Sequence, residues 1–171
     1  LARAGGYNAM VTMQSWMFLG SFQRLREDVV ANKDIVCMAH LGARAFDAIG
    51  GEVVQTTATV FENKRGSDKG IYLRLVDNVG EVEKAERMRD VDPDCDWYFE
   101  ADAADFSKIP GSPIAYWASE GVRKAFSEMR PLDYISKPIQ GLATADNNRF
   151  LRLWWEVDHR NVGYGFPSSK S

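Results

Sequence analysis

The sequence is poor in the residues that build disulfide frameworks and metal sites. Of its 171 residues only two are cysteine, Cys37 and Cys95, and they lie far apart among apolar or acidic neighbours. This pattern argues against a disulfide-stapled secreted domain and favours the reducing cytoplasm. The two histidines, His40 and His159, have no cysteine, histidine or carboxylate at ligand spacing. His40 ends an expected strand and is interpreted as a structural histidine.

Long apolar runs and a strong charge of one sign are also missing. The longest apolar stretch near the start, SWMFLG, is far too short to span a bilayer, and no charged leader precedes a signal-like core. We therefore expect no contact with a membrane. The formal net charge of −3 gives no overall basic footprint, so any contact with nucleic acid has to come from local patches.

Recognisable catalytic motifs are absent as well. The sequence contains no G-x-S-x-G and no P-loop. Asp92, Asp94 and Asp96 alternate like the first ligands of a calcium loop, but Trp97 and Ala103 stand where that loop needs glycine and glutamate. From the chemistry of the residues alone we predict no catalytic, cofactor-binding or metal-ligating residue.

What is present is the composition of an ordered globular protein, 45% hydrophobic and 26% charged. In the first half, β-prone runs alternate with helical spacing. The expected strands are 7–13, which is predicted to be buried, 35–40, 52–61 and 71–76; the expected helices are 21–32, with Ser21 as its cap, and a short piece at 43–51. The last two strands are predicted to pair as a β-hairpin. This order fits the second half of an open α/β sheet with an antiparallel strand ending it.

The character of the sequence changes after Asp77. A short charged helix, VEKAERMRD, runs into an acidic stretch from 90 to 105 that is broken by WYF. Ser112 and Pro113 fit the cap and first position of another helix, and SEGVRKAFSEM has amphipathic spacing. We place a boundary near 78–90 and expect three parts. These are an α/β part at 1–78, an acidic connector with short helices and irregular segments at 79–135, and a further region at 136–171.

Both ends of the sequence look like cut edges. The chain begins with LARAGGYNAM, without an initiator methionine, and stops at GYGFPSSKS soon after an aromatic run. We therefore expect a fragment of a longer protein.

Four blocks carry a resemblance to a known family. They are GGYNAMVTMQSWMFLGSFQRLRE, MAHLGARAFDAIGGEVVQTTATVF, IPGSPIAYWASE and QGLATADNNRFLRLWWEV. Together and in this order they resemble the PglX-type DNA adenine-N6 methyltransferases of BREX phage-defence systems, relatives of the large type IIG restriction-modification methyltransferases. The blocks are spread over most of the chain, from residue 5 to residue 157, and their shared order makes the match specific.

The resemblance implies a parent enzyme of the class I, S-adenosylmethionine-dependent type. Such enzymes flip an adenine out of double-stranded DNA and methylate its exocyclic N6, which is out of reach inside the base stack. In the family, a glycine-containing motif holds the methyl donor and an Asn-Pro-Pro-Tyr motif grips the adenine. Neither occurs in this sequence. The resemblance therefore implies that 1–78 is the C-terminal half of a Rossmann-like methyltransferase sheet, inactive by itself.

The resemblance also implies a contact to the flipped base in the loop before VVQTTATVF. Related enzymes offer an aromatic or apolar side chain from this loop. Phe46 is the candidate here, with Ile49 as a rival. The alternative is that Phe46 packs under a helix, because large aromatic side chains are usually buried.

In the family, a QGL-TGDN-RF pattern marks the entry to a target-recognition domain that approaches DNA. Ala145 replaces the family's glycine, which places the conformation of this loop in doubt if positive φ is needed. The alternative is a structural turn in which the asparagines cap the following segment. The residues proposed to contact DNA are Gln140, Gly141, Thr144, Asn147, Asn148, Arg149 and Arg152, and Asp146 and Phe150 also match the pattern.

Two hypotheses remain open from the sequence. The first is a catalytically incomplete piece of a DNA adenine methyltransferase. The second is a stand-alone, non-catalytic module that binds DNA or other defence-system proteins. A half-sheet leaves an unpaired strand edge and an uncovered apolar face. We therefore predict self-association that covers this edge.

Overall fold

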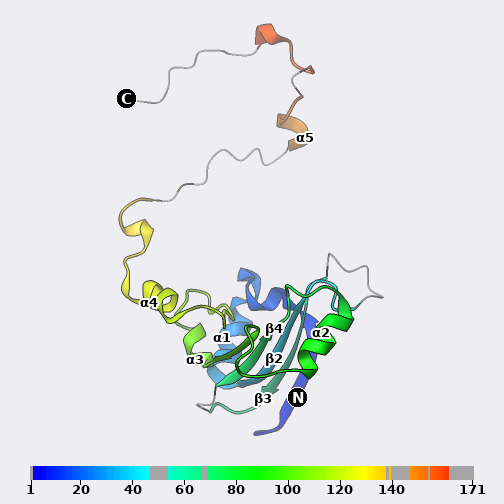
Figure 1. Ribbon diagram of the computed structural model, residues 1–171. Coiled ribbons are helices and arrows are strands. Elements are labelled where there is room, and N and C mark those ends of the chain that lie inside the picture. Colours follow the sequence, from blue (N-terminus) through cyan, green and yellow to red (C-terminus); the bar gives the residue numbers. More distant parts are fainter. Residues whose placement is uncertain are drawn as a thin grey trace. The chain divides into compact units, whose positions relative to one another are not determined.

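The computed structural model describes residues 2–46, 54–66, 69–137, 139, 147–153 and 155–161. The chain divides into two compact units, Leu1–Arg130 and Pro131–Ser171. The first unit contains the sheet and most of the helices (Figure 1). In the second, the described elements are the short helices η3 (Leu132–Tyr134), α5 (Asn147–Phe150) and η4 (His159–Asn161).

A five-stranded mixed sheet forms the centre of the first unit, with the strand order β1-β3-β2-β4-β5. Strand β3 is antiparallel to both β1 and β2, β4 is parallel to β2, and β5 is antiparallel to β4. Consequently β1, β2 and β4 run in the same direction. The strands are β1 (Tyr7–Met13), β2 (Asp34–Gly42), β3 (Thr56–Glu62), β4 (Gly70–Arg74) and β5 (Tyr98–Ala101).

The predicted β-hairpin between 52–61 and 71–76 is wrong. Strand β2 lies between β3 and β4 and pairs with both. The reason is burial: Ile35, Met38 and Ala39 of β2 are buried, and such a strand needs neighbours on both edges. The predicted helix at 43–51 is not seen at 43–46, where the chain makes turns and bends. Its remaining residues lie outside the described ranges.

Strand β1 has the predicted bounds, but the prediction that it is buried is wrong. All of its side chains except Thr12, which is half-buried, are exposed. Its position explains this: β1 is an edge strand of the described sheet and pairs only with β3. One face of β1 borders an apolar groove of about 540 Å³ that also contacts Trp16, Phe22, Leu25 and Phe61.

Helix α1 (Gln23–Asn32) begins later than predicted, and Ser21 does not cap it. Two 3-10 turns, η1 (Gln14–Met17) and η2 (Gly20–Phe22), lead from β1 into the helix, whose N-cap residue is Phe22. Arg26 of α1 is only 2% exposed. Its guanidinium donates to the carbonyl oxygens of Trp16, Leu19 and Gly111 at 2.7–3.0 Å. These bonds connect α1 both to the 3-10 turns that precede it and to the loop at Gly111.

The segment GSPIAYW is irregular rather than helical. Ser112 has a positive φ of 48°, Ile114 and Tyr116 are buried, and the Ile114 amide donates to the Met17 carbonyl at 3.0 Å. Ser112 and Pro113 suggested a helix, but the apolar Ile114 and Tyr116 that follow them fill the core instead. The Tyr116 ring stacks on Tyr72 with a centroid distance of 4.8 Å, so this segment closes one face of the sheet.

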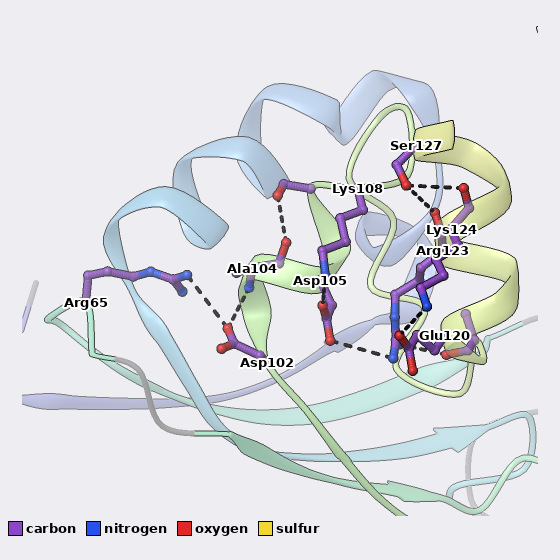
Figure 2. A network of polar contacts seen from close by, with 11 residues as sticks. Arg65, Asp102, Ala104, Asp105, Lys108, Glu120, Arg123, Lys124 and Ser127 are labelled. Atoms are coloured by element: carbon purple, nitrogen blue, oxygen red, sulfur yellow. Dashed lines mark hydrogen bonds and ion pairs between the residues drawn. The ribbon is translucent and has the colours of Figure 1, made fainter. Parts of the chain in front are cut away.

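The remaining helices are α2 (Gly80–Arg89), α3 (Ala103–Phe106) and α4 (Glu120–Glu128). Helices α1 and α3 lie side by side (Figure 1). Figure 2 shows an ion pair between α3 and α4, in which the Asp105 carboxylate lies 3.7 Å from the Arg123 guanidinium. The same carboxylate accepts from Lys108, just after α3, at 2.6 Å. Both cysteines are free.

Candidate nucleic-acid interface

Polar and aromatic side chains gather where the three parallel strands end. Strands β1, β2 and β4 end at Met13, Gly42 and Arg74, at the same edge of the sheet. In open α/β sheets, ligands bind outside the carboxyl ends of the strands. We call the six residues at this edge the rim cluster: Gln14, Phe18, His40, Gln55, Arg74 and Trp117.

The rim cluster surrounds a cavity of about 420 Å³, which Gly42, Ala43 and Val76 also line. This volume lies within the range of small-ligand sites, about 300–1,000 Å³. Gly42 has a φ of 67°, and a Cβ atom there would lie 3.0 Å from a methyl group of Val76. Glycine therefore suits the backbone and the close approach to Val76 at this point, where β2 leaves the sheet.

His40 is the buried centre of the rim cluster, and both of its ring nitrogens have partners. Nδ1 lies 3.0 Å from the Tyr116 hydroxyl, and Nε2 lies 2.6 Å from Oε1 of Gln14. Because the amide oxygen can only accept, Nε2 donates, and Nδ1 accepts from the tyrosine. The Gln14 amide nitrogen in turn donates to Oε1 of Gln55. The structure confirms the interpretation of His40 as a satisfied structural histidine.

The electrostatic surroundings keep His40 neutral. Burial, assisted by the nearby Arg74 and Lys84 cations, lowers its pKa from 6.5 to about 4. Burial likewise raises the pKa of the Tyr116 hydroxyl above its usual value. His40 and Tyr116 are therefore both neutral near pH 7, and their polar atoms are hydrogen-bonded within the protein.

The exposed part of the rim cluster is aromatic and cationic. Trp117 is 39% exposed and Phe18 is 37% exposed, and their rings meet edge to face with centroids 5.7 Å apart. The Arg74 guanidinium lies 5.4 Å from the centroid of the Trp117 ring and 3.6 Å from the Asp77 carboxylate. Flat rings beside a cation suit the stacking of a planar ligand.

The predicted contact to the flipped base lies in the loop that leaves this edge. Phe46 follows the end of β2 and is 41% exposed, so its side chain is accessible. Ile49 lies outside the described residues. The structure thus places Phe46 at the same end of β2 as His40.

The residues expected to contact DNA through the second unit are only partly described. Asn147, Asn148 and Arg149 are exposed and belong to α5. Arg152 donates from Nη1 to the carbonyl oxygens of Asn148 and Leu151 at 2.7 and 2.9 Å. Gln140, Gly141 and Thr144 lie outside the described ranges.

Sequence reasoning missed Phe18, Arg74 and Trp117 as site residues. The signal for two of them was present: Phe18 and Trp117 belong to two of the blocks that carry the family resemblance. Gln14, His40 and Gln55 belong to such blocks as well. Only the strand order reveals that blocks far apart in the sequence converge on one cavity.

The connection from β1 to α1 does not fit the methyl donor. After a strand, such a cofactor needs a glycine-rich turn that brings backbone N–H groups close to it. The connection from β1 to α1 instead carries the bulky Trp16, Met17 and Phe18. In the part of the chain that is described, His, Cys, Asp and Glu side chains form no group suited to a metal ion. Nor does any described helix combine the length and apolar character that a membrane span requires.

Comparison with curated proteins finds relatives over almost the whole chain. It is 44% identical over 159 residues to the adenine-specific methyltransferase BrxX of Escherichia coli O9:H4 (strain HS), covering 92% of the chain and 13% of that protein. It is 40% identical over 169 residues to the adenine-specific methyltransferase PglX of Lacticaseibacillus casei (strain Zhang), covering 96% of the chain and 14% of that protein. The chain thus spans about one seventh of these relatives' length. No protein-family model matches it.

A solved structure shares the fold. It comes from work described as the structural basis of complex assembly and conformational transition of the type I R-M system, and the match has a TM-score of 0.50. The match covers 78% of this chain and 31% of the other at 16% identity, so it supports the mixed α/β architecture alone. The relatives confirm the resemblance carried by the sequence blocks: the chain is homologous to one segment of the PglX-type adenine-specific methyltransferases.

Proposed function

We propose that the chain is the distal part of the catalytic domain, and the start of the target-recognition region, of a DNA adenine-N6 methyltransferase of a phage-defence system. The observation that carries this proposal is the 40–44% identity to adenine-specific methyltransferases over at least 92% of the chain. In this proposal residues 1–78 form the C-terminal half of a class I methyltransferase sheet. Residues 79–135 connect it to the recognition region at 136–171.

The parent protein would use S-adenosylmethionine as methyl donor and double-stranded DNA as substrate. When bound, the cofactor supplies an activated methyl group. The chain's own contribution is to the DNA: Phe46, with Ile49 as the alternative, contacts the flipped adenine, and Arg149 and Arg152 contact the backbone or bases. The exposure of Phe46 at the carboxyl edge of the sheet supports the first role. Other defence-system proteins are further partners in this proposal.

The experiment that tests this function is detection of N6-methyladenine in DNA by mass spectrometry. We expect the full-length protein, with S-adenosylmethionine and duplex DNA, to produce the modified base, and the 171-residue chain to produce none. Phe46→Ala in the full-length protein should lower kcat/KM by about tenfold or more through lost base contact, whereas Phe126→Ala, on the exposed face of α4, serves as the matched control. Absence of N6-methyladenine with the full-length protein would contradict the proposal and favour a non-catalytic scaffold.

A further inference from the structure

The rim cluster contains an exposed aromatic surface that takes no part in the DNA contacts proposed for Phe46 and Arg149. Trp117 and Phe18 are more than a third exposed, although apolar rings of this size are usually covered. Both line the 420 Å³ cavity, together with the Gln55 amide and the Arg74 guanidinium. Among the described residues, none that lines this cavity is acidic.

The Trp117 ring is held in place by its buried neighbours Tyr116 and His40. The adjacent Tyr116 is buried, stacked on Tyr72 with an interplanar angle of 12° and bonded to His40. The His40 ring then stacks against Trp117 with centroids 6.1 Å apart and an interplanar angle of 30°. A surface that is ordered before binding loses little conformational entropy when a ligand arrives.

The chemistry of this surface selects a flat, electron-rich ring attached to an anion. The exposed parts of the Trp117 and Phe18 rings offer stacking, which is tolerant of base identity because every nucleobase has a π-face. The Arg74 guanidinium, which also lies 3.6 Å from the Asp77 carboxylate, offers a positive charge to a phosphate. The Gln55 amide, whose oxygen accepts from Gln14, offers its N–H groups to a base edge. A nucleotide satisfies all of these groups together, whereas a purely apolar ligand would leave the cation and the amide unused.

We propose that Trp117, Phe18 and Arg74, which line the cavity without Phe46, form a stacking site for a nucleobase of the DNA strand. The proposal rests on the proposed function only for its source of nucleobases, because the binding surface is defined by the described residues themselves. Stacking at this site would hold an unpaired nucleotide beside the loop that begins at residue 43.

The test measures binding of fluorescein-labelled single-stranded oligodeoxynucleotides to the 171-residue chain by fluorescence anisotropy. One strand carries bases, and a second of equal length is abasic throughout, so that only the first can stack. We expect Trp117→Ala to weaken binding of the base-containing strand by about 5- to 100-fold and to leave the abasic strand unaffected. Phe18→Ala should act in the same direction with a smaller effect.

A matched pair of arginine variants separates stacking from general charge. Arg74→Gln and Arg87→Gln remove the same charge. Arg87 also lies over a tryptophan, 4.1 Å from the Trp97 ring centroid, but neither Arg87 nor Trp97 lines the cavity. Only Arg74→Gln should weaken binding of the base-containing strand. Unfolding midpoints of all variants confirm that each is folded at the assay temperature.

Several results would overturn the inference. These are no binding by the unmodified chain, no loss with Trp117→Ala, and equal losses for the two strands with Trp117→Ala. The proposed function is judged separately, by N6-methyladenine production. If the full-length protein methylates DNA while Trp117→Ala binds normally, only the stacking site fails. If it does not methylate while strand binding depends on Trp117, only the methyltransferase proposal fails.

Discussion

Two buried tyrosines, Tyr72 and Tyr116, differ in what their hydroxyl groups contact. The Tyr116 hydroxyl bonds to Nδ1 of His40 at 3.0 Å, whereas the Tyr72 hydroxyl has no hydrogen-bond partner among the described residues. A buried hydroxyl without a partner destabilises the folded state, and so does removal of one member of a buried pair. Removing the hydroxyl group should therefore change the free energy of unfolding in opposite directions at the two positions.

We expect Tyr72→Phe to raise the free energy of unfolding by about 1 kcal/mol, and Tyr116→Phe to lower it by about 1–3 kcal/mol. Each variant keeps the aromatic ring and removes one oxygen, so each serves as the control for the other. Urea unfolding at neutral pH measures both. A change of the same sign in the two variants would contradict the hydrogen-bond assignment.

The buried His40 makes a prediction about pH. Its pKa is lowered from 6.5 to about 4, mainly by burial. Above pH 6.5 the ring is neutral in the folded and unfolded states alike. Between pH 6.5 and 4 the unfolded state takes up the proton first, so the free energy of unfolding falls as the pH falls. The loss is at most about 1.4 kcal/mol per pH unit.

A His40→Gln variant isolates this effect from the titration of carboxylates, which the two proteins share. Urea unfolding at neutral pH and just above the His40 pKa should show a larger loss of stability in the unmodified chain than in the variant. Equal losses in the two proteins would show that His40 is not protected from protonation.

At the scale of elements, strand β1 combines an unpaired edge with an apolar groove. The groove of about 540 Å³ lies between β1, β3 and α1 and is lined by Met10, Met13 and Leu25 among others. An exposed edge with apolar side chains pairs readily with another chain. We therefore predict that the 171-residue chain self-associates through this face.

Methionine-to-lysine substitutions test this at two sites of nearly equal exposure. Met10 in the groove is 47% exposed, and Met88 on α2 is 45% exposed. Met10→Lys should weaken dimerisation by about tenfold or more, because it buries a charge in the interface, and Met88→Lys should not. Sedimentation velocity measures both, and a monomeric unmodified chain would contradict the prediction.

The elements also show what sequence patterns can and cannot predict. The β-branched run TTATVF and the helical spacing of VEKAERMRD are local signals, and β3 and α2 form there. Strand β5 was not predicted, because its short run, YFEA, lies in an acidic stretch and is recruited by pairing with β4. The hairpin was wrongly predicted for the same reason: strand pairing is a tertiary property, which adjacency in sequence does not determine.

At the scale of the whole molecule, the rim cluster also depends on tertiary structure that local sequence patterns do not predict. His40 was correctly interpreted as structural, since an isolated histidine at a strand end indicates a satisfied core group. The cavity was not predictable from residue patterns, because Phe18, Arg74 and Trp117 meet only when β1, β2 and β4 lie in one sheet. The sequence blocks did predict the family, which the relatives confirm.

Equilibrium binding of radiolabelled S-adenosylmethionine locates the methyl-donor site. In our proposal the chain is the distal part of a methyltransferase, and this site lies elsewhere in the parent protein. We therefore predict that the full-length protein binds the cofactor and that the 171-residue chain does not. Binding by the chain alone would contradict the placement of the donor site. Failure of the full-length protein to bind would contradict the methyltransferase proposal itself.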